Sequence, residues 1–147
     1  MSLKDRLATR KRPSITYQLR IDDDTVAQSE LVAARVADDE GRIVAAQSAV
    51  EACYEQVTIT ALPPAELEEL LQANPPPPAE QGKKLFNPVT FVPALLAVCV
   101  QADPPVTEED WAEFTTTGAM TAGEVAGLFN TAWELNYRIP DPNLGKE

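Results

Sequence analysis

The residue types that most often carry out chemistry in proteins are scarce in this sequence. Histidine is absent, which removes the commonest general base, the commonest metal ligand and every Ser–His or Cys–His nucleophile pair. The only two thiols, Cys53 and Cys99, stand at a spacing that fits neither a disulfide framework nor a zinc site. Their apolar neighbours indicate that both are buried and reduced. The sequence therefore predicts no metal, no cofactor and no small-molecule substrate.

Two short acidic or basic motifs resemble ligand sites only in part. Asp22-Asp23-Asp24 lacks the alternating spacing, the central glycine and the final glutamate of a calcium loop, so we expect it to cap the following helix. Gly82-Lys83-Lys84 lacks the upstream glycine and the Ser or Thr of a phosphate-binding loop. We therefore expect no enzyme. A small-molecule enzyme stays an alternative that a deep pocket of perturbed ionisable groups would favour.

An aromatic set in the last third of the chain is the remaining candidate site. Both tryptophans and two of the four phenylalanines lie between residues 111 and 133. Rings at helical spacing usually pack inward, so a plain hydrophobic core is one interpretation. The other makes part of the set a groove for an amphipathic helix of a partner protein. The candidate partner-binding residues are Trp111, Phe114, Phe129 and Trp133, with an acidic rim of Glu108, Glu109, Glu113, Glu124 and Glu134.

The net charge limits the kinds of partner. Twenty-three Asp and Glu against twelve Lys and Arg give a formal charge of −11, which repels phosphate backbones and makes nucleic acid a poor partner. Residues 1–12 are the exception, with five basic side chains and one acid. We expect this segment to be a flexible basic arm. If ordered, it could dock on its own acidic body, on another subunit or on an acidic partner.

The first half of the chain alternates between strand and helix patterns. Residues 15–21 and 54–60 each alternate apolar and polar side chains, as half-buried strands do. The stretch 25–53 between them is helical in composition, and its interruption at residues 38–41 predicts either a two-helix hairpin or one kinked helix. An isolated strand pair is marginal in water, so the pair must rest on helices or on a strand from another subunit.

The second half is helical, with breaks at prolines. A short helix is expected over residues 65–73, and Thr121 and Glu124 have the spacing of a capping box for a helix that runs to about Asn136. Residues 94–100 are apolar on all sides and must be surrounded, so they are the expected core helix, capped by Thr90 with Pro93 in its first turn.

These patterns together predict an α+β fold that is mostly helical, with a small antiparallel strand pair and a C-terminal helical bundle. The expected segments are the basic arm at 1–12, a strand–helix–strand segment at 13–62, a helical part of the same domain at 63–137 and a loose tail at 138–147. The most apolar run, residues 91–100, is too short to span a bilayer, and the start lacks a signal peptide, so a cytoplasmic protein is expected.

A succession of short motifs resembles a known family over roughly residues 54–136. The motifs are VTITALPP at 57–64, ELEELL at 66–71, FNPVTFVPALLA at 86–97, PPVTEE at 104–109, GEV at 123–125 and LF at 128–129. In this order they resemble the tail assembly chaperones of siphoviruses that infect actinobacteria. The N-terminal strand and helix segment matches less closely.

The resemblance implies a small, mostly helical protein that binds the tape-measure protein and keeps it soluble until the tail tube polymerises around it. Contacts with the tail tube protein and self-association would be further interactions. Such a helper would act in the host cytoplasm and be absent from the mature virion. The alternative is a structural tail or head-completion subunit whose strands join a neighbour's sheet. Stoichiometric copies in mature particles, measured by mass spectrometry, would favour that alternative.

The resemblance also implies a longer second product made by a programmed frameshift near the end of this reading frame. Leu144-Gly145-Lys146 can be encoded as CTG-GGA-AAG, which contains the slippery heptamer G-GGA-AAG. We predict that heptamer, with an overlapping downstream frame, in the gene. Nucleotide sequencing checks it, and a gene without a slippery run at these codons would end the two-product hypothesis.

Overall fold

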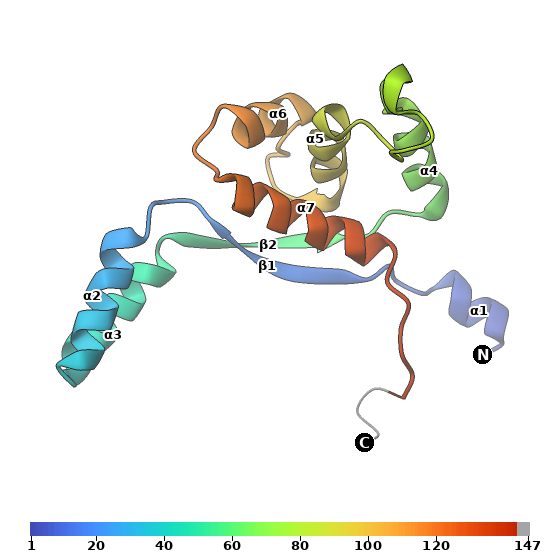
Figure 1. The fold of residues 1–147 in the computed structure, drawn as a ribbon. Coiled ribbons are helices and arrows are strands. Elements are labelled where there is room, and N and C mark those ends of the chain that lie inside the picture. Colours follow the sequence, from blue (N-terminus) through green and yellow to red (C-terminus); the bar gives the residue numbers. More distant parts are fainter. Residues whose placement is uncertain (144–147) are drawn as a thin grey trace. The chain divides into compact units, whose positions relative to one another are not determined.

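The structure, a computed structural model, describes residues 1–143 and has the predicted α+β fold, mostly helical with one antiparallel sheet (Figure 1). The sheet contains β1 (Ser14–Arg20), β2 (Tyr54–Thr60) and β3 (Val100–Gln101), in the order β1-β2-β3. The two longer strands lie where period-two alternation predicted them. The two-residue β3 was not predicted. It pairs antiparallel with β2, and Val100 lies opposite Ile59.

The chain divides into two compact units. One consists of residues 16–57, and the other of residues 1–15 together with 58 onward.

The unit formed by residues 16–57 contains a helical hairpin. Helices α2 (Thr25–Val36) and α3 (Glu40–Glu51) lie side by side (Figure 1), which settles the sequence alternatives in favour of two helices. The buried side chains of the two helices are Leu31 and Ala34 on α2 and Ala46 on α3. Asp38 takes the left-handed conformation at φ 52° in the turn, a conformation that Asp tolerates better than most residues.

The prediction that the run Asp22-Asp23-Asp24 caps α2 is confirmed at Asp23, whose Oδ1 accepts from the Thr25 amide at 3.0 Å and from the Thr25 hydroxyl at 2.6 Å. Asp24 occupies the N-cap position, but its side chain makes no capping hydrogen bond. It accepts hydrogen bonds from the Tyr54 hydroxyl at 2.7 Å and from the Gln28 amide at 3.1 Å. These bonds lower the pKa of the Asp24 carboxyl, the Tyr54 bond most.

The larger unit is built around α5 (Pro88–Cys99). Helices α4 (Pro64–Ala73), α6 (Glu108–Thr116) and α7 (Ala122–Asn136) all contact it. Phe91, Leu95, Leu96 and Cys99 are 0% exposed, whereas Val98 on the same helix is 45% exposed. The prediction that this apolar segment is the core is confirmed.

The predicted start of α5 was wrong by about one turn. Asn87, not Thr90, is the N-cap, and its side-chain oxygen accepts from the Val89 amide at 3.1 Å. Pro88 then takes the first helical position, which its missing N–H and fixed φ favour. Pro93 consequently lies inside the helix and not in its first turn.

The N-terminal arm contains a short helix, α1 (Leu3–Ala8), with a capping box between Ser2 and Asp5. Beyond it the guanidinium of Arg12 donates to the Ala61 carbonyl at 2.9 Å, and the Ala61 amide donates to the Pro13 carbonyl at 3.0 Å. The end of the arm is therefore attached to its own unit, one of the docking modes considered from the sequence. Its flexibility stays a prediction.

The core position of α5 gives a stability prediction. Leu96→Ala removes a fully enclosed side chain and leaves a cavity, so we expect a loss of about 2–5 kcal/mol in the free energy of unfolding. Val98→Ala on the same helix, where the side chain is 45% exposed, is the matched control and is expected to cost well under half as much. Urea denaturation followed by circular dichroism measures both. Equal losses would mean that α5 is not enclosed.

Candidate functional site

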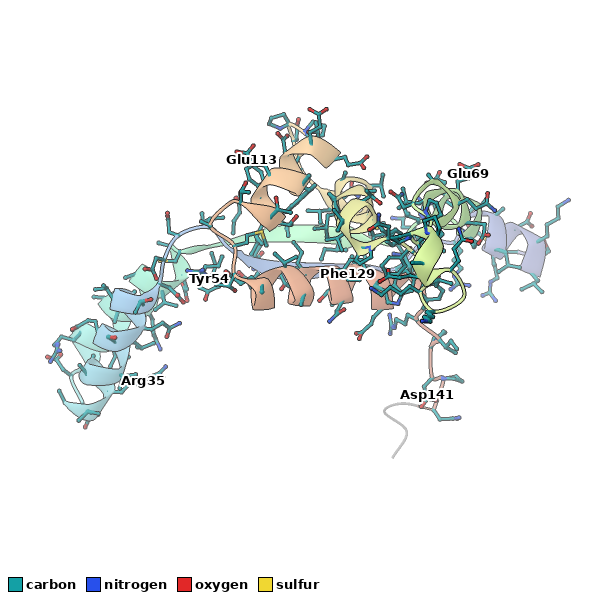
Figure 2. The ribbon with its side chains drawn as sticks, turned by 45° about the horizontal axis from the view of Figure 1, so that its top comes forward. Arg35, Tyr54, Glu69, Glu113, Phe129 and Asp141 are labelled. Atoms are coloured by element: carbon teal, nitrogen blue, oxygen red, sulfur yellow. The ribbon has the colours of Figure 1, made fainter. Side chains whose placement is uncertain are left out.

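The clearest candidate site begins with the aromatic side chains of α7. Phe129 and Trp133 are spaced by four residues, so they share one helix face, and Tyr137, the C-cap residue four positions further on, continues the same row. The start of the helix is fixed by the predicted capping box, which is confirmed. The Glu124 amide donates to Thr121 Oγ1 at 3.1 Å, and the Thr121 amide donates to Glu124 Oε1 at 2.9 Å. Figure 2 labels Phe129 on this helix.

Two phenylalanines from outside α7 complete the cluster. Phe91 comes from the first half of α5, and Phe86 from the loop just before it; their ring centroids lie 4.3 Å apart. The Phe86 ring lies 5.3 Å from Trp133 and 5.9 Å from Phe129. Trp133 in turn lies 4.6 Å from Tyr137. These separations are those of directly packed aromatic rings.

The rings of this cluster are not equally covered. Phe91 is 0% exposed and forms its base. Phe86, Phe129 and Trp133 are half-buried, and Tyr137 is 47% exposed. We call these four partly exposed residues the aromatic patch. Grouped aromatic side chains that stay partly open mark interaction sites more often than scattered apolar residues do, and Trp and Tyr are enriched among residues that dominate binding energy.

Apolar residues next in sequence to the aromatic patch are also exposed. Leu85, beside Phe86, is 63% exposed, and Ile139, two residues after Tyr137, is 90% exposed. Glu134 is an exposed acid on α7 itself, whereas the predicted acids Glu108, Glu109 and Glu113 lie on α6. The predicted acidic rim is thus divided between two helices.

A closed loop positions Phe86. The Asn87 amide donates to the Asn74 carbonyl at 3.0 Å, which joins the two ends of the proline-rich segment between α4 and α5. Asn74 is itself buried, and its side chain donates to the Leu70 carbonyl at 2.8 Å. The segment includes the short helix η1 (Pro78–Glu80) and an ion pair of 3.3 Å between Glu80 and Lys84. Phe86 is therefore held at the closure point of the loop.

Asn136 fixes the end of α7. Its side-chain oxygen accepts from the Leu62 amide at 2.7 Å, and its amide donates to the Ala132 carbonyl at 2.7 Å and to Cys99 Sγ at 3.6 Å. One side chain thereby joins the segment after β2, the last turn of α7 and the end of α5. Burial raises the pKa of the Cys99 thiol, against a smaller lowering by the Asn136 hydrogen bond.

The structure separates the four aromatic residues that the sequence grouped together. Phe129 and Trp133 belong to the aromatic patch, whereas Trp111 and Phe114 lie on α6 with their rings 6.3 Å apart. Trp111 is 3% exposed, so it offers almost no surface to a partner, and its indole N–H has no hydrogen-bond partner within the described part of the chain. Phe114 is 43% exposed.

Sequence reasoning missed Phe86 and Tyr137. Tyr137 continues the four-residue spacing from Phe129 and Trp133, so that spacing could have found it. Phe86 had no such signal, because its place depends on a loop closed by a hydrogen bond between two residues thirteen positions apart, Asn74 and Asn87.

A hollow of about 670 Å³ lies within residues 16–57, apart from the aromatic patch. Its lining consists of three carboxamides, one carboxylate, one phenol and a valine, from Gln18, Gln28, Val50, Glu51, Tyr54 and Gln56. Such groups can bind polar molecules by hydrogen bonds. Across residues 1–143, no group of three or more Cys, Asp or Glu side chains is placed to hold a metal ion.

The frameshift codons proposed for Leu144, Gly145 and Lys146 lie outside the described residues. None of the helices within residues 1–143 has the length and apolar character needed to cross a membrane. Models of protein families give no match to this chain, and searches of curated proteins and of solved structures give none either.

The different surroundings of the two cysteines give a labelling prediction. Cys99 is 0% exposed with a raised thiol pKa, whereas Cys53 is only half-buried, contrary to the expectation that both are buried. Because the thiolate is the reactive form, iodoacetamide should modify Cys53 in the native protein and Cys99 only after unfolding. Mass spectrometry of tryptic peptides measures the two rates, with Cys53→Ser as control. Equal native rates would contradict the packing around Cys99.

Proposed function

We propose that this protein is a tail assembly chaperone of a long-tailed phage, which binds the tape-measure protein and acts by binding rather than by catalysis. The observation that supports the proposal most is the aromatic patch, because it offers partly exposed rings on a rigid helix. The motif succession over residues 54–136 supports the proposed family, because it resembles that of tail assembly chaperones. The aromatic patch supports the proposed binding, because it is a surface suited to the client. The proposal places the protein in the host cytoplasm and outside the mature virion.

The chemistry of the client matches this surface. A tape-measure protein is long and helical, and its apolar stripes are exposed before the tube forms around them. Phe129, Trp133 and Tyr137 present an apolar row along one helix face, which suits a second amphipathic helix laid against it. The net charge of −11 keeps a complex with such a client dispersed. Partly exposed rings, as opposed to a deep pocket, also suit a contact that must later be released.

A structural subunit of the phage particle is the second candidate. The observation in its favour is that β1 is an edge strand of the sheet, so a neighbour's strand could extend it. The aromatic patch has no role in that function.

Alanine substitutions separate the aromatic patch from the rest of the predicted aromatic set. We expect Trp133→Ala to lower the yield of soluble tape-measure protein at least several-fold when both are co-expressed, because it removes the central ring of the patch. Phe114→Ala is the matched control: it removes an exposed aromatic ring of α6 and should leave client solubility unchanged. Circular dichroism of the variants without client shows whether each is folded.

Two outcomes would contradict the proposal. One is that the wild-type chain leaves the client insoluble. The other is that folded Trp133→Ala protein keeps the client as soluble as wild type does, while Phe114→Ala does not. That second result would indicate that the client binds at α6 and not at the aromatic patch.

A further inference from the structure

The outer edge of β1 lacks the features that usually prevent an edge strand from pairing with a strand of another molecule. β1 lies at the edge in the order β1-β2-β3, so within residues 1–143 no strand pairs with its other side. Edge strands are commonly protected by proline, lysine or a bulge, which discourage further pairing. The seven residues Ser14–Arg20, SITYQLR, include neither proline nor lysine. Such an edge is a template for another strand.

Two hydrogen bonds at the ends of the β1–β2 pair show which backbone groups face outward. The Ala61 amide donates to the Pro13 carbonyl at 3.0 Å, and the Ile21 amide donates to the Cys53 carbonyl at 2.8 Å. In an antiparallel pair, successive residues direct their backbone groups to alternate sides of the strand. The odd-numbered residues of β1 therefore bond to β2, and the even-numbered residues face the open edge.

The side chains of β1 also alternate between two faces. Ile15, Tyr17 and Leu19 form an apolar row on one face, and the polar Thr16 and Gln18 lie on the other. This apolar row is incompletely covered: Ile15 is 45% exposed, while Tyr17 and Leu19 are half-buried. A strand added at the open edge would cover more of the row if it carried apolar residues at matching positions.

We propose that β1 pairs antiparallel with β1 of a second copy of this chain, about a two-fold axis at Tyr17. In this register Thr16 lies opposite Gln18 of the partner subunit, and both direct their backbone groups to the shared edge. Ile15 lies opposite Leu19 of the partner subunit, so the two apolar rows join into one. A two-fold interface needs a strand that complements itself, and the SITYQLR pattern meets that condition.

Charge selects the antiparallel arrangement over the parallel one. Arg20 is the only charged residue of the strand and stands at its end. Antiparallel pairing puts the two Arg20 side chains at opposite ends of the ladder, whereas in-register parallel pairing would put them side by side at a cost. The inference does not depend on the identity of the client, so it can fail while the chaperone proposal holds.

Thr16→Pro tests the proposal at the open edge. The Thr16 amide points away from β2, so proline removes an intermolecular hydrogen bond without removing one from the β1–β2 ladder. We expect wild type to sediment at twice the 16.0 kDa of one chain and Thr16→Pro to sediment as a monomer with an unchanged circular dichroism spectrum. Thr16→Val keeps the amide and is the matched control, expected to stay dimeric. Moderate salt is used because two copies of charge −11 repel each other.

A disulfide cross-link tests the register of the proposed β1–β1 pair without a proline substitution that could disturb the fold. Directly opposed side chains of an antiparallel pair lie within reach of a disulfide, so Tyr17→Cys, made together with Cys53→Ser, should form a covalent dimer under mild oxidation. Glu55→Cys in the same background, an exposed position on the central strand β2, should not. The proposal is overturned by a monomeric wild type, by a Thr16→Pro variant that stays dimeric, or by cross-linking at position 55 and not at 17.

Discussion

The need to enclose α5 is the constraint on which the larger unit depends. This helix is apolar on nearly every side, and Phe91, Leu95 and Leu96 are completely removed from solvent. One helix cannot cover another on all sides, so α4, α6 and α7 each contribute an apolar stripe. Two asparagines close the arrangement at its ends: Asn74 joins α4 to the start of α5, and Asn136 joins the end of α7 to the chain after β2. Their amides can satisfy backbone groups that the helix packing leaves at these junctions.

The aromatic patch is the edge of this same core. Phe91 is enclosed, the three rings packed against it are half-buried, and Tyr137, which contacts Trp133, is 47% exposed. The surface offered to a partner is thus rigid, because core packing against Phe91 fixes Phe86 and Trp133 in place. Rigid aromatic side chains lose little conformational freedom on binding, so less of the contact energy is spent on ordering them. Electrostatic repulsion between acidic copies limits nonspecific association through the same patch.

Local patterns in the sequence predicted most helices and strands. The N-cap of α5 and the burial of the individual tryptophans were not predicted, because they depend on the details of capping and on long-range packing. Strict alternation located β1 and β2, and the Thr121–Glu124 spacing located the start of α7, because each of these signals is complete within a few residues. The start of α5 was misplaced because Thr90 and Asn87 are both good capping residues, and only the position of Pro88 distinguishes them. The difference between enclosed Trp111 and half-exposed Trp133 could not be predicted, because both occupy the apolar stripe of an amphipathic helix. What covers each stripe depends on how the helices pack around α5.

The most direct test of the central claim is hydrogen exchange of the protein with and without the proposed client, a tape-measure protein, followed by mass spectrometry. Binding at the aromatic patch predicts slower exchange in the peptides that contain Phe86 and in the second half of α7, from Phe129 to Asn136. Helix α6, with Trp111 and Phe114, is expected to exchange at an unchanged rate. Slower exchange confined to α6 or to the α2–α3 hairpin, with α7 unaffected, would contradict the account.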